Sequence, residues 1–422
     1  MPIENLLSDC FCDNVRASLF SAPSLSLFFV TVNALAATNC AMIERSGGGH
    51  GRETNGVQQQ DIVQRMTIRM KDIARDLGLS VVTVSKVLRD HPDIGEETRK
   101  RVLQRVKELD YEPNILARSL VTGRSYLIGL IVPGLIHPFF AEIAKALSKT
   151  IVDKGYSLIV SSSEEDPALE AREIRHLLAR RLDALVIASS GKDTQLFRRM
   201  QSESQPFVLI DRIFDDLEAD FVGIDDVAAG RMATTHLIEM GRKHIAHISG
   251  RENSTGVRRK EGYLEALRAH KLPVREDYIL SRDFVDTDSQ RQGSEAMRQL
   301  LERKPRPDAV FCHNDPIAIG AMNVILDAGL RIPEDVALVG CGNLNYNEWL
   351  RVPLTSIDQR SHLIGQRAGE ILLAMIEGRE WPAPSKVILE PALVVRASTT
   401  GGQTESAKVA GKTRKKAAGA RK

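Results

Sequence analysis

Apolar residues recur at helical spacing in three consecutive stretches that begin near residue 70. The first, MKDIARDL, has one apolar face and is followed by Gly78, a residue that suits a helix end and a tight turn. Ser80 is a good N-cap for the second helix, which runs to about Leu88. The third, GEETRKRVLQRVKELDY, is expected to bury Val102, Leu103, Val106 and Leu109. The pattern predicts a small all-α domain.

Two valines of the second helix fall outside its buried face. A helix buried on one side needs apolar residues at i, i+3 and i+4, and Val84, Val87 and Leu88 supply them. Val81 and Val82 lie in the first turn, away from that stripe. Two helices joined by a short glycine-containing turn, the second opening with serine, describe a helix-turn-helix. In that motif the first residues of the second helix meet base edges, but any small three-helix domain could show the same pattern.

From Tyr126 to about Arg396 short buried-strand runs alternate with helical stretches. The runs are YLIGLIVP, SLIVSSS, ALVIASS, FVLIDR, FVGID, HIAHISG, AVFCHND and VALVGCG. This alternation predicts an α/β fold of parallel sheets wrapped by helices. The segment is large for one sheet, so two lobes with a cleft between them are expected. Ligands bind at the carboxyl ends of such strands.

Composition narrows the class of protein without identifying partners. The chain has 422 residues, 43% hydrophobic and 27% charged, which is ordinary for a soluble globular protein, and its net charge is only +2. Its five cysteines form no C-x-x-C pair, which favours a reducing compartment over disulfides or structural zinc. No H-E-x-x-H, G-x-S-x-G or phosphate-loop motif is present, so the sequence indicates neither an enzyme nor a metal or cofactor site.

The two ends of the chain have compositions unlike the rest. Residues 1–66 include an apolar run, Leu25–Ala37, which is of signal-peptide length but follows acidic residues and a single arginine. A secretory signal needs a positive start, so this region is interpreted as disordered or as upstream sequence of a misassigned start, with Met66 or Met70 as the initiator. Residues 399–422 form a basic tail that is expected to be disordered, either attracting nucleic acid or having no role.

Three sequence blocks carry a resemblance to a known family. The core DIARDLGLSVVTVSKVL, then EETR, then YEPNILARSL follow one another in residues 72–120. This region resembles the DNA-binding part of the LacI/GalR family of bacterial regulators, and the resemblance extends over residues 67–398. It implies a helix-turn-helix domain at 67–112, a hinge at 113–124 and a periplasmic-binding-protein-like effector and dimerisation domain at 125–398. The expected lobes are roughly 125–225 with 356–385, and 226–355 with 386–398.

The resemblance also implies which residues touch DNA. Val81 and Val82 would read bases by apolar contact, best matched by the thymine methyl group, and Lys86 would donate to guanine. Hydroxyls would reach phosphates from Ser80, Thr83, Ser85 and Thr98, although Thr83 and Ser85 could equally be ordinary helix surface. In the hinge, the family forms helices on operator DNA and wedges a leucine into the minor groove. The corresponding residues are Asn114, Ala117 and Leu120.

Carried over to the effector domain, the resemblance implies a cleft for a sugar-sized polar ligand. Its residues would be Phe139, Phe140, Asp211, Arg212, Thr255, Arg259, Phe284, Asn314 and Asp315, with Pro138 beside the phenylalanines. Asp315 could instead be structural, at the start of a helix. The family usually has an aspartate where this chain has Gly342, which puts an ordinary hexose effector in doubt, and Asn343 could substitute for it.

The function predicted from these features is sequence-specific transcriptional regulation, and within that class repression. The chain would act in the cytoplasm, associated with the nucleoid, as a homodimer on a pseudo-palindromic double-stranded operator, under control of a small-molecule effector and without a cofactor. The alternative is an exported periplasmic solute-binding protein, which residues 67–124 argue against. The sequence leaves open the operator, the identity of the effector and whether the protein forms tetramers. It also leaves open whether the effector releases DNA or promotes DNA binding.

Overall fold

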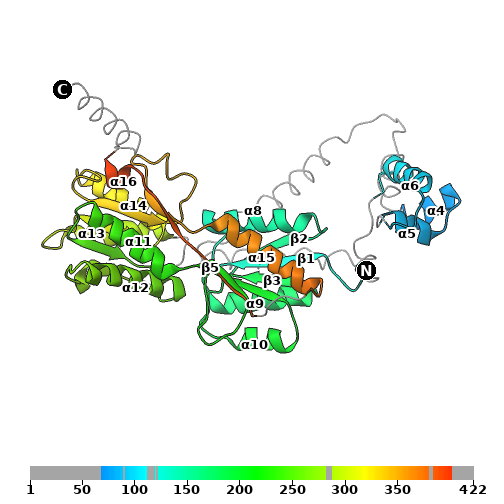
Figure 1. Ribbon diagram of the computed structural model, residues 1–422, viewed down its shortest axis with the longest axis horizontal. Helices are drawn as coiled ribbons and strands as arrows, with labels where there is room; N and C mark the ends of the chain where they lie inside the picture. Colours follow the sequence, from blue (N-terminus) through cyan, green and yellow to red (C-terminus); the bar gives the residue numbers. More distant parts are fainter. Residues whose placement is uncertain are drawn as a thin grey trace, which may run out of the picture. The chain divides into compact units, whose positions relative to one another are not determined.

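The computed structural model describes residues 68–88, 91–111, 119, 122–281, 288–379 and 384–401. By its internal contacts the chain divides into two compact units between Pro113 and Asn114 (Figure 1). The expectations for residues 1–66, for nearly all of the hinge and for the tail beyond Gly401 lie outside the described residues. In the described part, no helix is both long and apolar enough to span a membrane.

The first unit contains the three helices that the periodicity predicts. They are α4 (Met70–Leu77), α5 (Val81–Leu88) and α6 (Glu96–Glu108). Gly78 has a φ of +65° and closes α4, because a residue without a Cβ enters this left-handed conformation freely. Ser80 caps α5, since its Oγ accepts a hydrogen bond of 3.0 Å from the N–H of Thr83. Ile73, Val84 and Val102 are fully buried at the centre of the domain.

The prediction for α6 was wrong at one residue. Val102 is buried, and Val106 and Leu109 pack against the small core, but Leu103 is 47% exposed. An α-helix turns by about 100° per residue, so the two neighbours Val102 and Leu103 cannot both point at a core this small.

The first lobe of the second unit is built on a six-stranded parallel sheet with the order β11-β5-β4-β3-β1-β2. Its strands are β1 (Leu127–Val132), β2 (Ser157–Ser162), β3 (Ala184–Ile187), β4 (Phe207–Ile210), β5 (Phe221–Ile224) and β11 (Lys386–Leu389). Helices α8 (Pro138–Val152) and α15 (Ser361–Ile376) share one apolar cluster with the sheet. Helices α9 (Pro167–Ala179) and α10 (Gln195–Ser202) cover the opposite face (Figure 1).

The second lobe repeats this plan with the strand order β12-β10-β9-β8-β6-β7, in which only the β10–β12 pair is antiparallel. The strands are β6 (Ile245–Ile248), β7 (Ile279–Leu280), β8 (Ala309–Cys312), β9 (Ala337–Cys341), β10 (Thr355–Asp358) and β12 (Ala392–Val394). Its helices are α11 (Asp226–Glu239), α12 (Ser254–Ala269), α13 (Ser289–Leu301), α14 (Asp315–Asp327) and α16 (Ala397–Thr400), with a 3₁₀ turn, η1 (Glu276–Tyr278). The α11/α12 pair covers one face of the sheet and the α13/α14 pair the other.

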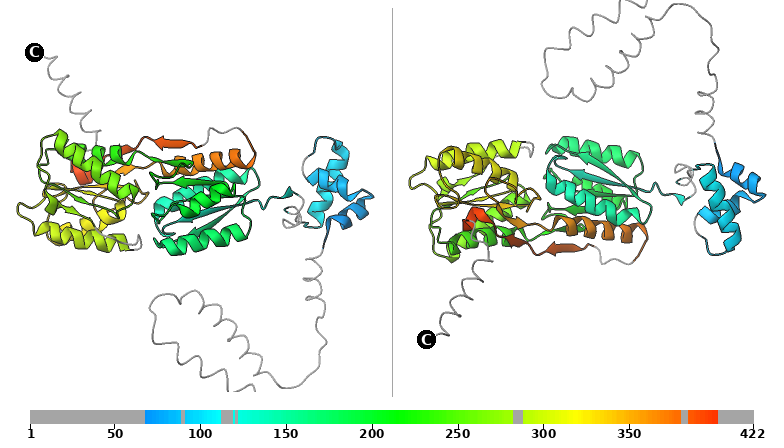
Figure 2. Two further views of the ribbon diagram at one scale, coloured as in Figure 1. Left: turned by 90° about the horizontal axis from the view of Figure 1, so that it is seen from below. Right: turned by 90° about the horizontal axis from the view of Figure 1, so that it is seen from above.

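The chain passes between the lobes three times: from β5 to α11, from β10 to α15, and from β11 to β12. Figure 2 follows the last passage along β11 and β12, drawn in orange to red. Two expected boundaries are corrected by this arrangement. Residues 356–358 belong to the second sheet through β10, and residues 386–389 belong to the first through β11, because the pairing partner rather than chain order decides which sheet a strand joins.

A third correction concerns the start of the basic tail. Thr399 and Thr400, expected to be disordered, end helix α16, and Thr399 is buried. Its Oγ1 lies 2.9 Å from Nε2 of His236 and 2.8 Å from Oγ1 of Thr355. These contacts to α11 and β10 hold the segment against the second lobe.

Reciprocal glycines bring the helices of each pair in the second lobe into backbone contact. A Cβ placed on Gly320 of α14 would lie 1.8 Å from the carbonyl oxygen of Gln290 in α13, and one on Gly293 would lie 2.0 Å from that of Ile317. The α11/α12 pair is built the same way through Gly230 and Gly262, where a Cβ would lie 2.1 and 2.0 Å from carbonyl oxygens. Only glycine permits so close an approach.

A buried histidine makes the second lobe sensitive to acid. His247 is fully buried between Phe311 and Tyr263, and burial lowers its pKa from 6.5 to about 4. In the unfolded chain this imidazole is protonated below pH 6.5, whereas in the folded lobe it stays neutral down to about pH 4. The contribution of the neutral histidine to the free energy of unfolding is therefore fully present above pH 6.5. It is lost as the pH falls from 6.5 to 4, by about 3 kcal/mol in total. We expect His247→Phe to remove this contribution to the pH dependence of the free energy of unfolding. Urea unfolding at pH values from 7.5 to 4.5 measures it.

His362→Phe provides the matched control, because His362 is exposed on α15. Burial also lowers the pKa values of His236 and His313, so the pH dependence should shrink rather than vanish. An unchanged pH dependence in His247→Phe would contradict this account of the buried imidazole.

Candidate nucleic-acid interface and effector cleft

The first turn of α5 presents both surplus valines to solvent. Val82 is 63% exposed and Val81 45%, whereas Val84 and Val87 of the same helix are buried. Exposed β-branched apolar side chains at a helix start cost hydration free energy and gain nothing from the domain core. Their position is the one that enters the major groove in a helix-turn-helix.

Two of the hydroxyls predicted to reach phosphates bond to each other within the domain. Ser80 Oγ and Thr83 Oγ1 lie 2.8 Å apart, so the cap residue and the third residue of α5 bond to each other. Ser85 and Thr98 are half-buried, the latter in the first turn of α6. The predicted hinge contacts Asn114, Ala117 and Leu120 lie outside the described residues.

Lys86 has an acidic neighbour that the sequence reasoning overlooked. Its Nζ lies 3.4 Å from the Oδ2 of Asp93, in the loop between α5 and α6; the Lys86 side chain is 35% exposed and that of Asp93 62%. Surface pairs of this kind contribute little to stability, so the lysine can exchange the carboxylate for another acceptor. The two residues are seven positions apart, and Asp93 lies beyond the end of α5. The contact is therefore not one of the i, i+3 or i, i+4 ion pairs that a helix pattern would have indicated.

A small cavity of about 30 Å³ lies between the two lobes. The first lobe contributes Glu165 and Arg212 to its lining, and the remaining lining residues come from the second lobe. These are Gly250, Arg251, Asn253, Ser289, Gln292, His313, Asn314 and Ile317. The loops after β2, β4, β6 and β8 supply most of the lining, so the cavity lies at the carboxyl ends of the strands of both sheets.

Arg212 and Glu165 form a buried ion pair at the floor of the cleft. Nη1 and Nη2 of Arg212 lie 2.9 and 2.5 Å from the two carboxylate oxygens of Glu165, and Nη1 also donates to the carbonyl of Ser189. Two parallel hydrogen bonds of this kind fix both side chains. Arg251 reaches across from the second lobe, its Nη1 lying 3.5 Å from Oε2 of Glu165.

The structure brings two of the predicted effector residues, Arg212 and Asn314, into the lining. Asp211 is adjacent, with its Oδ2 at 3.8 Å from Nε of Arg212. Phe139 and Phe140 instead pack edge to face in the core of the first lobe and are 3% and 4% exposed. Phe284 lies outside the described residues.

Arg259 and Thr255 are occupied within the second lobe. The Nε of Arg259 donates to Asp226 at 2.8 Å, and its Nη1 donates to the carbonyl of His313. Burial raises the pKa of the Asp226 carboxyl, and the Arg259 guanidinium opposes that rise. The hydroxyl of Thr255 donates to the capping oxygen of Asn253, so it serves the start of α12.

Asp315 is structural. It is fully buried, and its carboxylate accepts hydrogen bonds from the Leu344 N–H, the Asn347 amide and the Ser356 hydroxyl at 2.6–3.0 Å. The N-cap of α14 is Asn314, whose Oδ1 accepts from the N–H of Ile317, so the aspartate ties α14 to the loop after β9 rather than capping the helix.

Asn343 does not replace the carboxylate that the family usually has at position 342. Its Oδ1 accepts a hydrogen bond of 2.8 Å from Nη2 of Arg396, beside the carbonyl of Leu354, which Arg396 also binds. Gly342 itself has a φ of +138°, and the carboxylate of Asp315 lies 3.0 Å from where its Cβ would be. The loop after β9 therefore adds no carboxylate to the cavity lining.

His313 is a lining residue that the predicted set did not include. Its ring lies over Gly250, where a Cβ would come within 2.5–2.7 Å of three ring atoms, so the ring position requires glycine there. Burial, reinforced by Arg259, holds its pKa well below the usual range, and the imidazole is neutral. Sequence reasoning also missed Glu165, Arg251, Asn253, Ser289 and Gln292, although the first three directly follow predicted strands.

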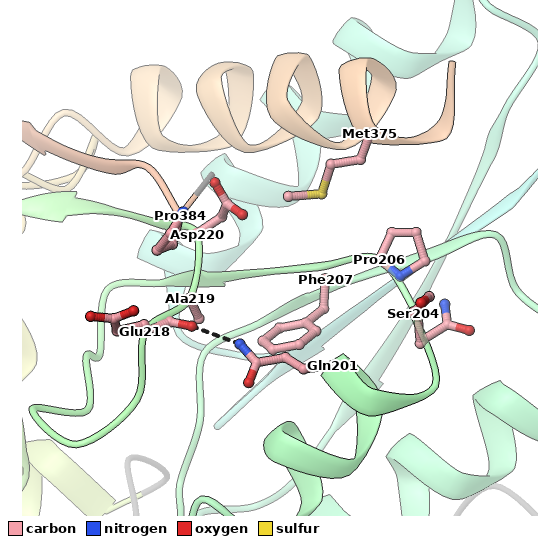
Figure 3. Close-up of a pocket in the computed structure, with 10 residues that line it drawn as sticks. Gln201, Ser204, Pro206, Phe207, Glu218, Ala219, Asp220, Met375 and Pro384 are labelled. Carbon is pink, nitrogen blue, oxygen red and sulfur yellow. Dashed lines mark hydrogen bonds between the residues drawn. The ribbon is translucent and has the colours of Figure 1, made fainter. Parts of the chain in front are cut away.

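A larger hollow lies elsewhere, at the amino-terminal edge of the first sheet (Figure 3). Phe207, Pro206, Met375 and Pro384 give it an apolar wall, and the amide of Gln201 donates to the carbonyl of Glu218 across it. It contains none of the predicted effector residues. The cleft between the lobes is therefore the better effector site.

Comparison with known proteins gives a consistent result for both units. Residues 69–114 match the family described as bacterial regulatory proteins, lacI family, and residues 125–392 match periplasmic binding proteins and sugar binding domain of LacI family. The HTH-type transcriptional repressor PurR of Actinobacillus pleuropneumoniae is 32% identical over 331 residues, covering 78% of this chain and 97% of the relative. PurR of Pectobacterium carotovorum is 33% identical over 338 residues, covering 79% and 97%.

Solved structures agree. A transcriptional regulator CelR–cellobiose complex is 30% identical with a TM-score of 0.60, covering 79% of this chain and all of the other. The lac repressor dimer bound to operator and the anti-inducer ONPF is 25% identical with a TM-score of 0.69, covering 79% and 99%.

Proposed function

This chain belongs to the LacI family of bacterial regulatory proteins, and from that premise we propose that α5 reads an operator half-site while the cleft between the lobes holds the controlling effector. The protein is a DNA-binding transcriptional repressor, and it works as a homodimer. Since a repressor must reach the chromosome, its compartment is the cytoplasm, and we place it with the nucleoid.

The observation that carries the DNA-reading proposal is the exposure of Val81 and Val82 at the start of α5. They supply apolar contact for the thymine methyl group, while Lys86 supplies the hydrogen bond to a guanine. Two copies related by a two-fold axis require two half-sites in inverted order. The family match over residues 69–114 also excludes the periplasmic receptor as the main interpretation, because such a receptor has no use for a DNA-reading domain.

Effector binding in the cleft changes the equilibrium between arrangements of the two lobes. By linkage, the effector must change DNA affinity by the same factor as DNA changes effector affinity. The cleft residues proposed for this role are Arg212 and Asn314 from the predicted set, together with Arg251 and His313. The relatives are repressors rather than enzymes, and we assign the cleft to binding without turnover.

Selection of bound sequences from a random duplex pool tests the proposal. The full chain should enrich an inverted repeat, with thymine beneath the valines and guanine within reach of Lys86. Repeating the selection with Val82→Ala should relax the preference for thymine and leave the guanine in place. Absence of any enriched repeat would contradict the proposed function. An unchanged preference for thymine in Val82→Ala would show that this valine makes no specific base contact.

A further inference from the structure

The cleft between the lobes presents hydrogen-bond donors to its interior and keeps its carboxylates covered. Glu165 has a side chain that is only 2% exposed, because Arg212 binds both of its oxygens. Asp211 and Arg212 are each 10% exposed. Arg251, at 32%, is the most accessible of these four charged side chains. A ligand entering the cavity therefore meets a guanidinium before it meets a carboxylate.

Arg251 is weakly held by its present partner. Its Nη1 lies 3.5 Å from Glu165 Oε2 and 3.3 Å from the carbonyl oxygen of the same residue, whereas Arg212 binds that carboxylate at 2.5 and 2.9 Å. The Glu165 carboxylate thus faces two guanidinium groups, and it is bound much more closely by Arg212 than by Arg251. Guanidinium groups bind carboxylates and phosphates most strongly at about 2.7–2.9 Å, so Arg251 gains by exchanging Glu165 for an anionic group of a ligand.

Two neutral lining residues, Asn253 and Asn314, add donors to the cavity. The side-chain oxygens of Asn253 and Asn314 are used as helix caps, accepting from the N–H groups of Gly256 and Ile317, which leaves their NH₂ groups. Both residues lie at helix starts that line the cavity, those of α12 and α14, and Ser289 adds the start of α13. Helix N-termini carry partial positive charge and favour anions.

Among the described lining residues, the only carboxylate that could accept from the hydroxyls of a neutral sugar is Glu165, which is covered. Position 342 is glycine, the Oδ1 of Asn343 is bound to Arg396, and Asp315 is saturated in the core. Asp226 is bonded to Arg259 behind the cavity wall. The lining therefore lacks a free carboxylate for polyol recognition among the residues that the structure describes.

We propose that the effector of this repressor is a small polar metabolite carrying a carboxylate or phosphate group, and that Arg251 binds this group and selects for it. The inference rests on the proposed function, since it assigns a ligand class to the effector cleft. It makes Arg251 a specificity-determining residue, while Arg212 stays fixed by Glu165 and orients the floor of the site.

Matched ligand series test the proposal on the full-length protein. Thermal unfolding and titration calorimetry would compare D-glucose, D-ribose and cellobiose with the acids D-gluconate and D-glucuronate and with glucose 6-phosphate and ribose 5-phosphate. We expect stabilisation only by members of the acid or phosphate arms, and the arm that responds identifies the anionic group. Stabilisation by a neutral sugar, or by no acid or phosphate, overturns the proposal.

Variants at Arg251 locate the contact. For the ligand that binds, Arg251→Gln should weaken binding roughly 10- to 100-fold, and Arg251→Lys should restore part of it because the charge returns without the planar fork. Arg258→Gln is the matched control: it removes the same charge seven residues on, where Arg258 pairs with the 90%-exposed Asp215 and does not line the cavity. Equal binding by Arg251→Gln and wild type overturns the assignment.

The same variants keep this inference separate from the proposed function. Operator selection is run both without and with the ligand series, because the sequence leaves open whether the effector releases DNA or promotes its binding. An enriched operator together with a neutral ligand refutes the anionic effector alone. Failure to enrich any operator under either condition refutes the regulator itself.

Discussion

Replacing Lys86 by alanine should weaken operator binding by about 10- to 100-fold, that is by 1–3 kcal/mol, and should relax the preference at one base pair of each half-site. The side chain is half-buried on the helix that carries Val81 and Val82, and its weak pair with Asp93 is readily exchanged for a guanine. Fluorescence anisotropy on the selected operator and on a scrambled duplex, at one fixed salt concentration, measures both the affinity and the preference.

Two further substitutions sharpen this test. Lys107→Ala removes the same charge from the far end of α6 and should change affinity little and preference not at all. Asp93→Asn should strengthen binding by roughly two- to fivefold, because it frees Lys86 and removes a negative charge from the exposed surface near it. If Lys86→Ala weakened the operator and the scrambled duplex equally, the lysine would contact phosphate rather than a base.

Gly320→Ala should cost the effector domain about 3 kcal/mol of unfolding free energy or more. In an isolated helix the change would stabilise by nearly 1 kcal/mol, since alanine is the better helix former. Here the new methyl would lie 1.8 Å from the carbonyl oxygen of Gln290, and that oxygen belongs to the rigid backbone of α13. The two helices must separate, which loosens the packing of both against the second sheet.

Urea unfolding followed by circular dichroism measures this loss. Gly191→Ala is the control within the same domain, because its Cβ would meet the nearest atoms at an ordinary 3.7 Å. We expect the control to unfold as wild type does. Equal stability of Gly320→Ala and wild type would show that α13 and α14 slide apart without cost.

Local pattern predicted the elements better than their partners. All eight expected strand runs form strands, because each is a short apolar segment between turn signals. The short β7, β10, β11 and β12 were not predicted, and the last two have partly exposed residues rather than a buried run. The partner of β11 is β5, which lies more than 100 residues earlier in the chain. No local pattern contains a pairing over such a distance.

The site shows the same limit at the level of side chains. Family positions indicated Arg259 and Asp315, but each is held by partners inside the second lobe. Arg251 and Glu165 were not predicted, since their meeting depends on two loops from different lobes. The exposure of Val81 and Val82 was predictable, because one helix and its periodicity suffice to determine it.

The three passages of the chain between the lobes have a consequence for biosynthesis. A ribosome releases the chain from its amino end, so β1 to β5 emerge early, but α15 and β11 of the same lobe emerge only after residue 360. Until then the apolar face that α15 covers and the edge of β5 remain open. The first lobe thus cannot finish folding before nearly all of the second has been synthesised, and the nascent protein exposes the unpaired edge of β5 (Phe221–Ile224) until β11 (Lys386–Leu389) has been made.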